Sequence, residues 1–138
     1  MRYPFNKPKS KYRNEKVTFQ GMSFDSKKEL QRYLFLVDAE RRGVISDLQR
    51  QVKFELIPAI TEEYVEHLKT KDKVKTRTVQ SAVTYICDFT YLKDDKIVIE
   101  DVKSSPSLVT KEYRLKKKMM LAIHGLIVKE VYNASETI

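Results

Sequence analysis

Two acidic residues and a lysine lie in stretches of the chain that otherwise have the pattern of buried strands. Asp88 interrupts the apolar stretch 85–91, while Asp101 and Lys103 end the apolar stretch 97–103. A buried charge is costly unless it is paired or bound to a metal. Because side chains two residues apart on a strand share a face, Asp101 and Lys103 are expected to point the same way, and a neighbouring strand can bring Asp88 beside them.

These three residue types are suited to phosphodiester hydrolysis. Two carboxylates can hold Mg²⁺, with water and a phosphate oxygen completing the coordination, and Mn²⁺ is expected to substitute for it. A bound metal ion lowers the pKa of its water and stabilises the charge of the transition state. Lys103 would orient or help deprotonate the attacking water and offset charge on the phosphate.

A helix is expected from about Ser26 to Gly43, ahead of the strands. Ser26 and Glu29 match a capping box, and Gly43 is a typical residue just after a helix. Apolar residues at helical spacing predict its buried stripe: Leu30, Tyr33, Leu34 and Val37. Glu29 has two interpretations, since it either caps this helix or turns toward the sheet and joins the metal site.

The remaining patterns predict a mixed sheet. Alternating residues place a strand within 44–57, and the segments 82–91 and 97–103 are joined by a polar turn at 93–96, which indicates a hairpin. A second helix is expected at about 109–124 and a last strand at 126–132. The order helix, three strands, helix, strand indicates an α/β or α+β domain spanning residues 17–138, with helices flanking a mostly four-stranded mixed sheet.

The charge of the chain favours a polyanion as partner. Among 138 residues, 27 are Lys or Arg and 19 are Asp or Glu, which gives a net charge of +8. Such an excess is typical of proteins that bind DNA or RNA. Residues 1–16 form a basic arm and residues 61–81 a long basic hairpin or loop; each either contacts nucleic acid or is only a solvated segment. The candidate DNA contacts are Lys9, Lys11, Arg13, Gln51, Lys75, Arg77, Lys111, Arg114 and Lys116.

Composition also excludes several classes of protein. No apolar run approaches the roughly 18 residues of a membrane span, and no signal-peptide pattern is expected at the N-terminus. The single Cys87 excludes an internal disulfide and fits a cytoplasmic setting. Two His and one Cys are too few for a structural zinc site of the Cys/His type.

Asp88 followed by Asp101-Val102-Lys103 resembles the signature of the PD-(D/E)XK nuclease superfamily, and the expected element order resembles its restriction-endonuclease-like core. Over residues 20–130 the chain more narrowly resembles a phage- and prophage-associated, nuclease-like domain family that is similar to Holliday-junction resolvases. The segments that carry this likeness are 24–29, 43–51, 85–91, 100–103 and 110–116. Cys87 stands where the superfamily pattern has proline.

The resemblance implies a phage-derived, Mg²⁺-dependent DNA endonuclease in a bacterial host, acting on branched recombination or replication intermediates. It implies that Asp88, Asp101 and Glu29 hold the metal, that Lys103 acts on the water, and that Lys116 reaches the scissile phosphate. Glu100, beside Asp101, is a rival ligand because a bulge could exchange the two. A homodimer is expected where two strands are cut. The alternatives are a DNA-binding accessory module without catalysis and an RNA-binding protein.

Overall fold

The computed structural model describes residues 15–138. The predicted contacts Lys9, Lys11 and Arg13, and most of the predicted basic arm, lie outside these residues. Within the described part, no helix is long and apolar enough to cross a membrane.

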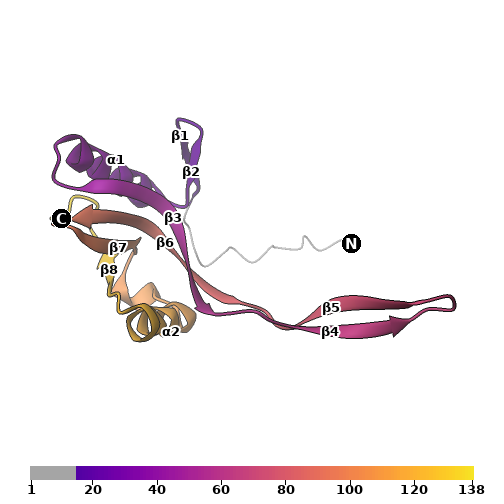
Figure 1. The fold of residues 1–138 in the computed structure, drawn as a ribbon. Helices are drawn as coiled ribbons and strands as arrows, with labels where there is room; N and C mark the ends of the chain where they lie inside the picture. Colours follow the sequence, from indigo (N-terminus) through magenta and orange to yellow (C-terminus); the bar gives the residue numbers. More distant parts are fainter. Residues whose placement is uncertain (1–14) are drawn as a thin grey trace, which may run out of the picture.

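A four-stranded mixed sheet forms the centre of the fold, as predicted (Figure 1). Its strands are β3 (Ser46–Ile57), β6 (Val83–Lys93), β7 (Lys96–Val102) and β8 (Val128–Val131), in the order β3-β6-β7-β8. β6 is antiparallel to both β3 and β7, whereas β8 is parallel to β7. Asp94 and Asp95, both with positive φ, form the two-residue turn between β6 and β7.

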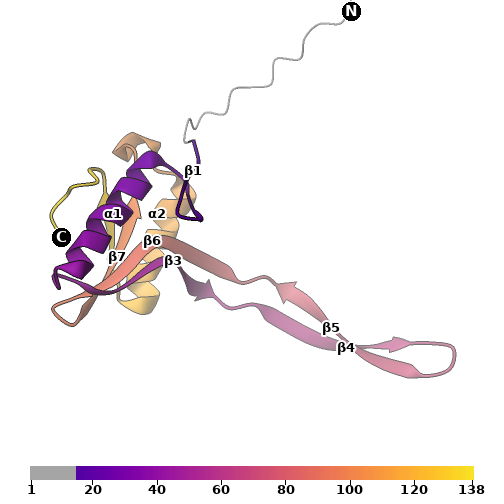
Figure 2. The same ribbon diagram turned by 90° about the horizontal axis from the view of Figure 1, so that it is seen from above.

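Two helices cover opposite faces of this sheet (Figures 1 and 2). Helix α1 spans Lys27–Arg41, and α2 spans Lys111–Met119 on the connection from β7 to β8. The segment predicted as one helix over 109–124 is instead α2 followed by a π-helical turn, η2 (Met120–His124), with a short 3₁₀ helix, η1 (Pro106–Leu108), ahead of it. Gly125 ends η2 in the left-handed conformation (φ 68°), which glycine adopts without a steric cost.

The buried face of α1 differs from the predicted apolar stripe. Glu29, Arg32, Leu36 and Ala39 are buried, whereas Leu34 and Val37 are 42% and 37% exposed. Ser26 caps the helix, and its side chain accepts a hydrogen bond from the Glu29 N–H at 3.1 Å. The prediction from apolar spacing was therefore wrong about Leu34 and Val37, because the buried face of α1 is turned toward the partners of Glu29 and Arg32.

Two further hairpins add to the predicted elements. β1 (Val17–Phe19) and β2 (Met22–Phe24) form a small hairpin before α1. β4 (Ile60–His67) and β5 (Asp72–Gln80) form a long two-stranded hairpin that projects far from the body of the domain (Figures 1 and 2). The segment 61–81, predicted to be a hairpin or a loop, is thus mostly hairpin.

Two hydrophobic clusters fill the two sides of the sheet. One joins Tyr85 and Cys87 of β6 to Tyr113 and Met120 of the α2 side. The other joins Phe89 and Tyr91 of the same strand to residues of α1. Residues 85, 87, 89 and 91 would all share one face of a regular strand, so the alternation of β6 reverses near Asp88.

A carboxylate cluster between helix α1 and the central sheet

Asp88 and Asp101 come together because β6 and β7 pair in register. The ladder ends at the pair Phe89 and Glu100, and Asp88 and Asp101 lie one residue beyond it. Asp88 Oδ2 accepts a hydrogen bond from the Val102 N–H at 2.8 Å. Both aspartates line one cavity of about 190 Å³, in which Lys103 and Glu29 also take part.

Asp101 is held by two partners. Lys103 Nζ lies 2.8 Å from Asp101 Oδ1, in agreement with the shared strand face that was predicted. The Tyr85 hydroxyl donates to Asp101 Oδ2 at 2.5 Å. Lys103 Nζ also lies 3.7 Å from the centre of the Tyr113 ring, a cation–π contact. These contacts fix the positions of the carboxylate and the ammonium group before any substrate binds.

Glu29 belongs to both the helix cap and the cavity. Its Oε2 accepts a hydrogen bond from the Asp25 N–H at 3.0 Å, at the entry to α1. Its side chain is 3% exposed and lines the same cavity as Asp88 and Asp101. The two interpretations offered by the sequence are therefore compatible, since one carboxylate oxygen serves the cap while the other faces the cluster.

Gln51 bridges two of the carboxylates. Its Nε2 lies 3.4 Å from Glu29 Oε1 and 3.4 Å from Asp88 Oδ1. Gln51 has a φ of 52°, although it lies within β3, where a residue other than glycine adopts positive φ only at a cost. Its neighbours Arg50 and Val52 pair with Phe89 and Cys87, so Gln51 is opposite Asp88.

The face alternation of β3 also reverses at Gln51. Arg50 stacks on Phe24, and its guanidinium carbon is 3.9 Å from the ring centre, on the α1 side of the sheet. Val52, two residues later, packs in the cluster on the α2 side. In both strands the side chains change faces at the same position, Gln51 in β3 and Asp88 opposite it in β6. This change places both polar side chains at the cavity, between the two hydrophobic clusters.

A second hollow continues from the cavity along α2. It has a volume of about 460 Å³ and shares Asp25, Asp88, Asp101 and Lys103 with the first. Gln51 and Lys116 also line it. Lys116 Nζ is paired with Glu112 Oε1 at 2.9 Å, so the lysine lies in the groove beside a carboxylate. Together the two hollows form a groove with the carboxylate cluster at its centre.

Negative charge is concentrated in this groove. Burial, followed by repulsion from Asp101 and Glu29, raises the pKa of Asp88 to about 8. Burial also raises the pKa of Glu29, and the hydrogen bond from the Asp25 backbone opposes this shift. Acids that are this close together disfavour one another's ionised forms, and a cation between them would relieve the repulsion.

The chemistry of the donor atoms fits a hard divalent cation, since Glu29, Asp88 and Asp101 all offer carboxylate oxygens at the cavity, which Asp25 also lines. In residues 15–138, however, no three His, Cys, Asp or Glu side chains are already arranged to hold a metal ion. Asp101 has both oxygens engaged by Lys103 and Tyr85. Metal binding at this cluster therefore requires an exchange of side-chain contacts, most simply those made by Lys103 or Gln51.

Glu100, the rival ligand, points to the opposite face of the sheet. It is fully buried and forms an ion pair with Arg32, whose Nη2 lies 2.6 Å from Glu100 Oε1. The Tyr91 hydroxyl donates to the same carboxylate at 2.6 Å. Arg32 Nη1 also donates to the backbone oxygens of Ala134 and Glu136. The structure thus places Glu100 in a network that ties α1 to the C-terminal segment, apart from the cluster.

The predicted DNA contacts are distributed over several surfaces. Lys116 and Gln51 line the groove, and Lys111 is exposed at the start of α2. Arg114 lines a different cavity, together with Lys118 and Leu121. Lys75 and Arg77 lie on the projecting hairpin, where they form ion pairs with Glu66 and Glu62. The predicted basic hairpin therefore neutralises part of its own charge.

Sequence patterns missed several residues of the site. Tyr85 and Tyr113 contact Asp101 and Lys103 but read as ordinary core aromatics. Lys28 Nζ lies 3.4 Å from the Lys103 backbone oxygen and lines the cavity. Cys87 was noted where the nuclease pattern has proline; burial raises the pKa of its thiol to about 12, which keeps it neutral. Of these residues, only Tyr85 could have been found from the sequence, because it lies three residues before Asp88 in the same predicted strand.

A comparison with protein families shows what the chain is similar to. The model of the family described as "Protein of unknown function (DUF1064)" matches residues 9–132. No curated protein matches the chain. No solved structure matches it either.

Proposed function

The chain belongs to the DUF1064 family, and we propose that it is a metal-dependent DNA endonuclease of the PD-(D/E)XK type. One observation carries this proposal: a single cavity is lined by Glu29 of α1, Asp88 of β6, Asp101 of β7 and Lys103, which directly follows β7. Charged groups are costly to bury together, so such a cluster favours a functional site over a merely structural one.

The side chains have distinct roles in this proposal. Asp88, Asp101 and Glu29 hold Mg²⁺ or Mn²⁺, which when bound supplies an acidified water and neutralises charge on the phosphate. Lys103 orients the attacking water and offsets the charge that develops on the phosphate oxygens. Tyr85 keeps Asp101 in place through its 2.5 Å hydrogen bond. Gln51 positions Glu29 and Asp88.

The groove supports a nucleic-acid strand as substrate. It continues from the carboxylate cluster to Lys116, which lines the hollow shared with Asp88 and Asp101 and supplies a cation for a phosphate of the strand. The net charge of +8 favours binding through phosphates, which recognises shape more than sequence. We therefore propose branched recombination or replication intermediates as substrates, a homodimer when two strands are cut, and a phage-derived protein acting in the bacterial cytoplasm.

A cleavage assay tests this function. Supercoiled plasmid, linear duplex and a synthetic four-way junction are incubated with Mg²⁺, with Mn²⁺ and with chelator. We expect metal-dependent cutting that Lys103→Met and Asp101→Asn each reduce by at least about 100-fold, the usual cost of removing a group that stabilises the transition state. Lys118→Met, which removes a cation outside the groove, is the matched control and should cut normally.

The second candidate is a DNA-binding module with this fold and no catalysis. It is favoured by the double engagement of Asp101 and by the lack, in the described residues, of a ready-made metal group. It predicts junction binding with no cutting under any metal, and binding that survives Asp101→Asn. Preferential binding of RNA without metal dependence would instead support an RNA-binding protein.

A further inference from the structure

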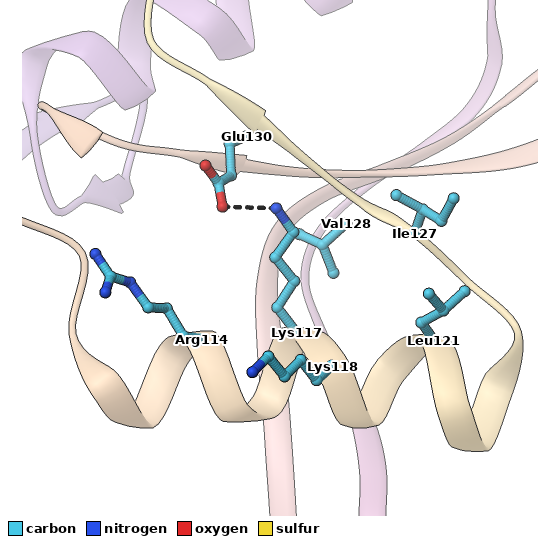
Figure 3. Close-up of a pocket in the computed structure, with 7 residues that line it drawn as sticks. All are labelled: Arg114, Lys117, Lys118, Leu121, Ile127, Val128 and Glu130. Carbon is cyan, nitrogen blue, oxygen red and sulfur yellow. Dashed lines mark hydrogen bonds and ion pairs between the residues drawn. The ribbon is translucent and has the colours of Figure 1, made fainter. Parts of the chain in front are cut away.

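A separate cavity, drawn in Figure 3, is lined by a different face of α2 from the one that lines the carboxylate groove. Its volume is about 340 Å³, and it is bounded by α2, η2 and the segment leading into β8. Arg114, Lys117, Lys118 and Leu121 reach it from the helical side. Their spacing of three, one and three residues puts them on one helical face, whereas Tyr113 and Lys116 face the groove.

Exposed aliphatic side chains form one end of this cavity. Leu121 is 53% exposed and Ile127 is 72% exposed, while Val128 beneath them is buried. Figure 3 shows Leu121 and Ile127 on the same side of the cavity, with Arg114 at the opposite end. An apolar concavity with a polar rim is a common property of surfaces that bind a protein partner, because burying such side chains stabilises a complex.

The rim of the cavity is cationic. Lys117 Nζ lies 2.7 Å from Glu130 Oε1. In residues 15–138 no ion pair engages Arg114 or Lys118, while the Lys116 between them is paired on the groove side. Two cations beside the apolar end therefore remain available to an acidic ligand. A nucleic acid would use these cations but would leave Leu121 and Ile127 in water.

We propose that this cavity is a docking site for a partner protein that presents a short acidic segment with a bulky apolar side chain. The apolar side chain lies against Leu121, Ile127 and Val128, and the flanking carboxylates pair with Arg114 and Lys118. Because the cavity and the carboxylate groove lie on different faces of α2, a partner can dock while the groove is occupied. This assignment does not depend on the proposed nuclease activity.

Fluorescence anisotropy with the full chain tests the docking site. The probe is a fluorescein-labelled peptide, Asp-Asp-Leu-Phe-Asp-Asp. One control peptide has Ser-Ser in place of Leu-Phe, and the other has lysine in place of every aspartate. We expect saturable binding of the probe and at least about tenfold weaker binding of both controls, because each lacks one of the two recognised features. Equal binding of any control would overturn the proposal.

Surface variants locate the binding. Ile127→Ser and Lys118→Glu change exposed side chains, so circular dichroism should show an unchanged fold. Each substitution should reduce the affinity for the probe peptide by about tenfold. Lys111→Glu, at the start of α2 and outside the cavity, is the matched control and should bind normally. Amide shifts in ¹⁵N spectra should fall on residues 114–121 and 127–130.

Two outcomes would contradict the docking site. One is the absence of amide shifts at these residues with 1 mM probe, a concentration that detects even a weak complex. The other is a duplex DNA that displaces the probe and whose own affinity falls in Lys118→Glu but not in Ile127→Ser. That result would assign the rim cations to a nucleic-acid surface.

Discussion

At the scale of a single residue, the ionised form of Asp88 destabilises the folded protein. Because its pKa in the folded protein is raised to about 8, the folded state binds a proton more tightly than the unfolded state does. The free energy of unfolding of the metal-free protein should therefore fall as pH rises from about 4 toward 8, and level off above that range. A bound cation should reverse the trend, since it favours the ionised carboxylate.

Asp88→Asn should therefore stabilise the metal-free protein while abolishing metal binding. The neutral amide keeps an acceptor for the Val102 N–H and removes the repulsion from Asp101 and Glu29. We expect a gain on the order of 1–2 kcal/mol at pH 8, less than the full pKa shift would give, because water screens a partly exposed group. Urea unfolding with chelator at pH 5 and pH 8 measures it. A gain of the same size at pH 5 would contradict this explanation.

Variants of the neighbouring acids Glu100 and Asp101 should have different effects, one on stability and the other on DNA cleavage. Glu100→Gln leaves Arg32 without its ionised partner in a fully buried site, and we expect a loss of stability of about 3 kcal/mol. Its folded fraction should still cut DNA. Asp101→Asn should have the opposite profile, with little change in stability and no cutting. Unfolding and cleavage measured on both variants test this, and a Glu100→Gln protein that is stable yet inactive would make Glu100 a ligand.

Gln51 combines backbone strain with a position between two carboxylates. Gln51→Gly and Gln51→Ala both lose the amide, but only glycine adopts a φ of 52° without a steric cost. We expect the glycine variant to be more stable than the alanine variant by about 1 kcal/mol. Both should bind Mg²⁺ more weakly, which isothermal calorimetry can measure. Equal stability of the two variants would mean that the strand relaxes at this position.

At the scale of elements, the β4–β5 hairpin is separable from the domain. Its side chains are nearly all exposed, and it projects away from the sheet (Figure 2). On one face Arg77 pairs with Glu62 and its guanidinium stacks on Tyr64, whereas Val65 and Val74, opposite one another on the other face, are 50% and 64% exposed. An isolated two-stranded hairpin is marginal in water, so this one contributes little to the stability of the body.

Replacement of residues 60–80 with a short Asn-Gly turn should leave the body folded. Because the hairpin buries little surface against the sheet, the free energy of unfolding should change by less than about 1 kcal/mol. Junction affinity should fall, because the replacement removes the exposed lysines near the tip, Lys69, Lys71 and Lys73. Calorimetric melting and a gel-shift assay measure the two effects. A large drop in Tm would show that the hairpin supports the core.

At the scale of the whole molecule, the excess of positive charge should govern affinity. We expect the logarithm of the junction affinity to fall linearly with the logarithm of salt concentration. Lys116→Ala should reduce that slope by about one unit if Lys116 contacts a phosphate. Arg77→Ala, which removes a cation on the projecting β4–β5 hairpin and outside the groove, should change it less. A salt titration of both variants provides the comparison, and equal slopes would remove Lys116 from the interface.

The sequence alone predicted those parts of the fold that depend on contacts between residues close together in the chain. The capping pair Ser26 and Glu29, the turn between β6 and β7 and the shared face of Asp101 and Lys103 follow from contacts within a few residues. The mixed sheet followed from the order of such elements. Each of these depends on backbone geometry, which neighbouring residues largely decide.

Only the tertiary structure decided which faces of these elements meet. The orientation of α1 depends on Arg32 finding Glu100, which lies 68 residues away in the sequence. The reversal of alternation at Gln51 and Asp88 depends on two cores on opposite sides of the sheet, and no local pattern marks it. A long-range partner can offset the cost of burying charge or of straining a strand, and that partner exists only in the folded chain.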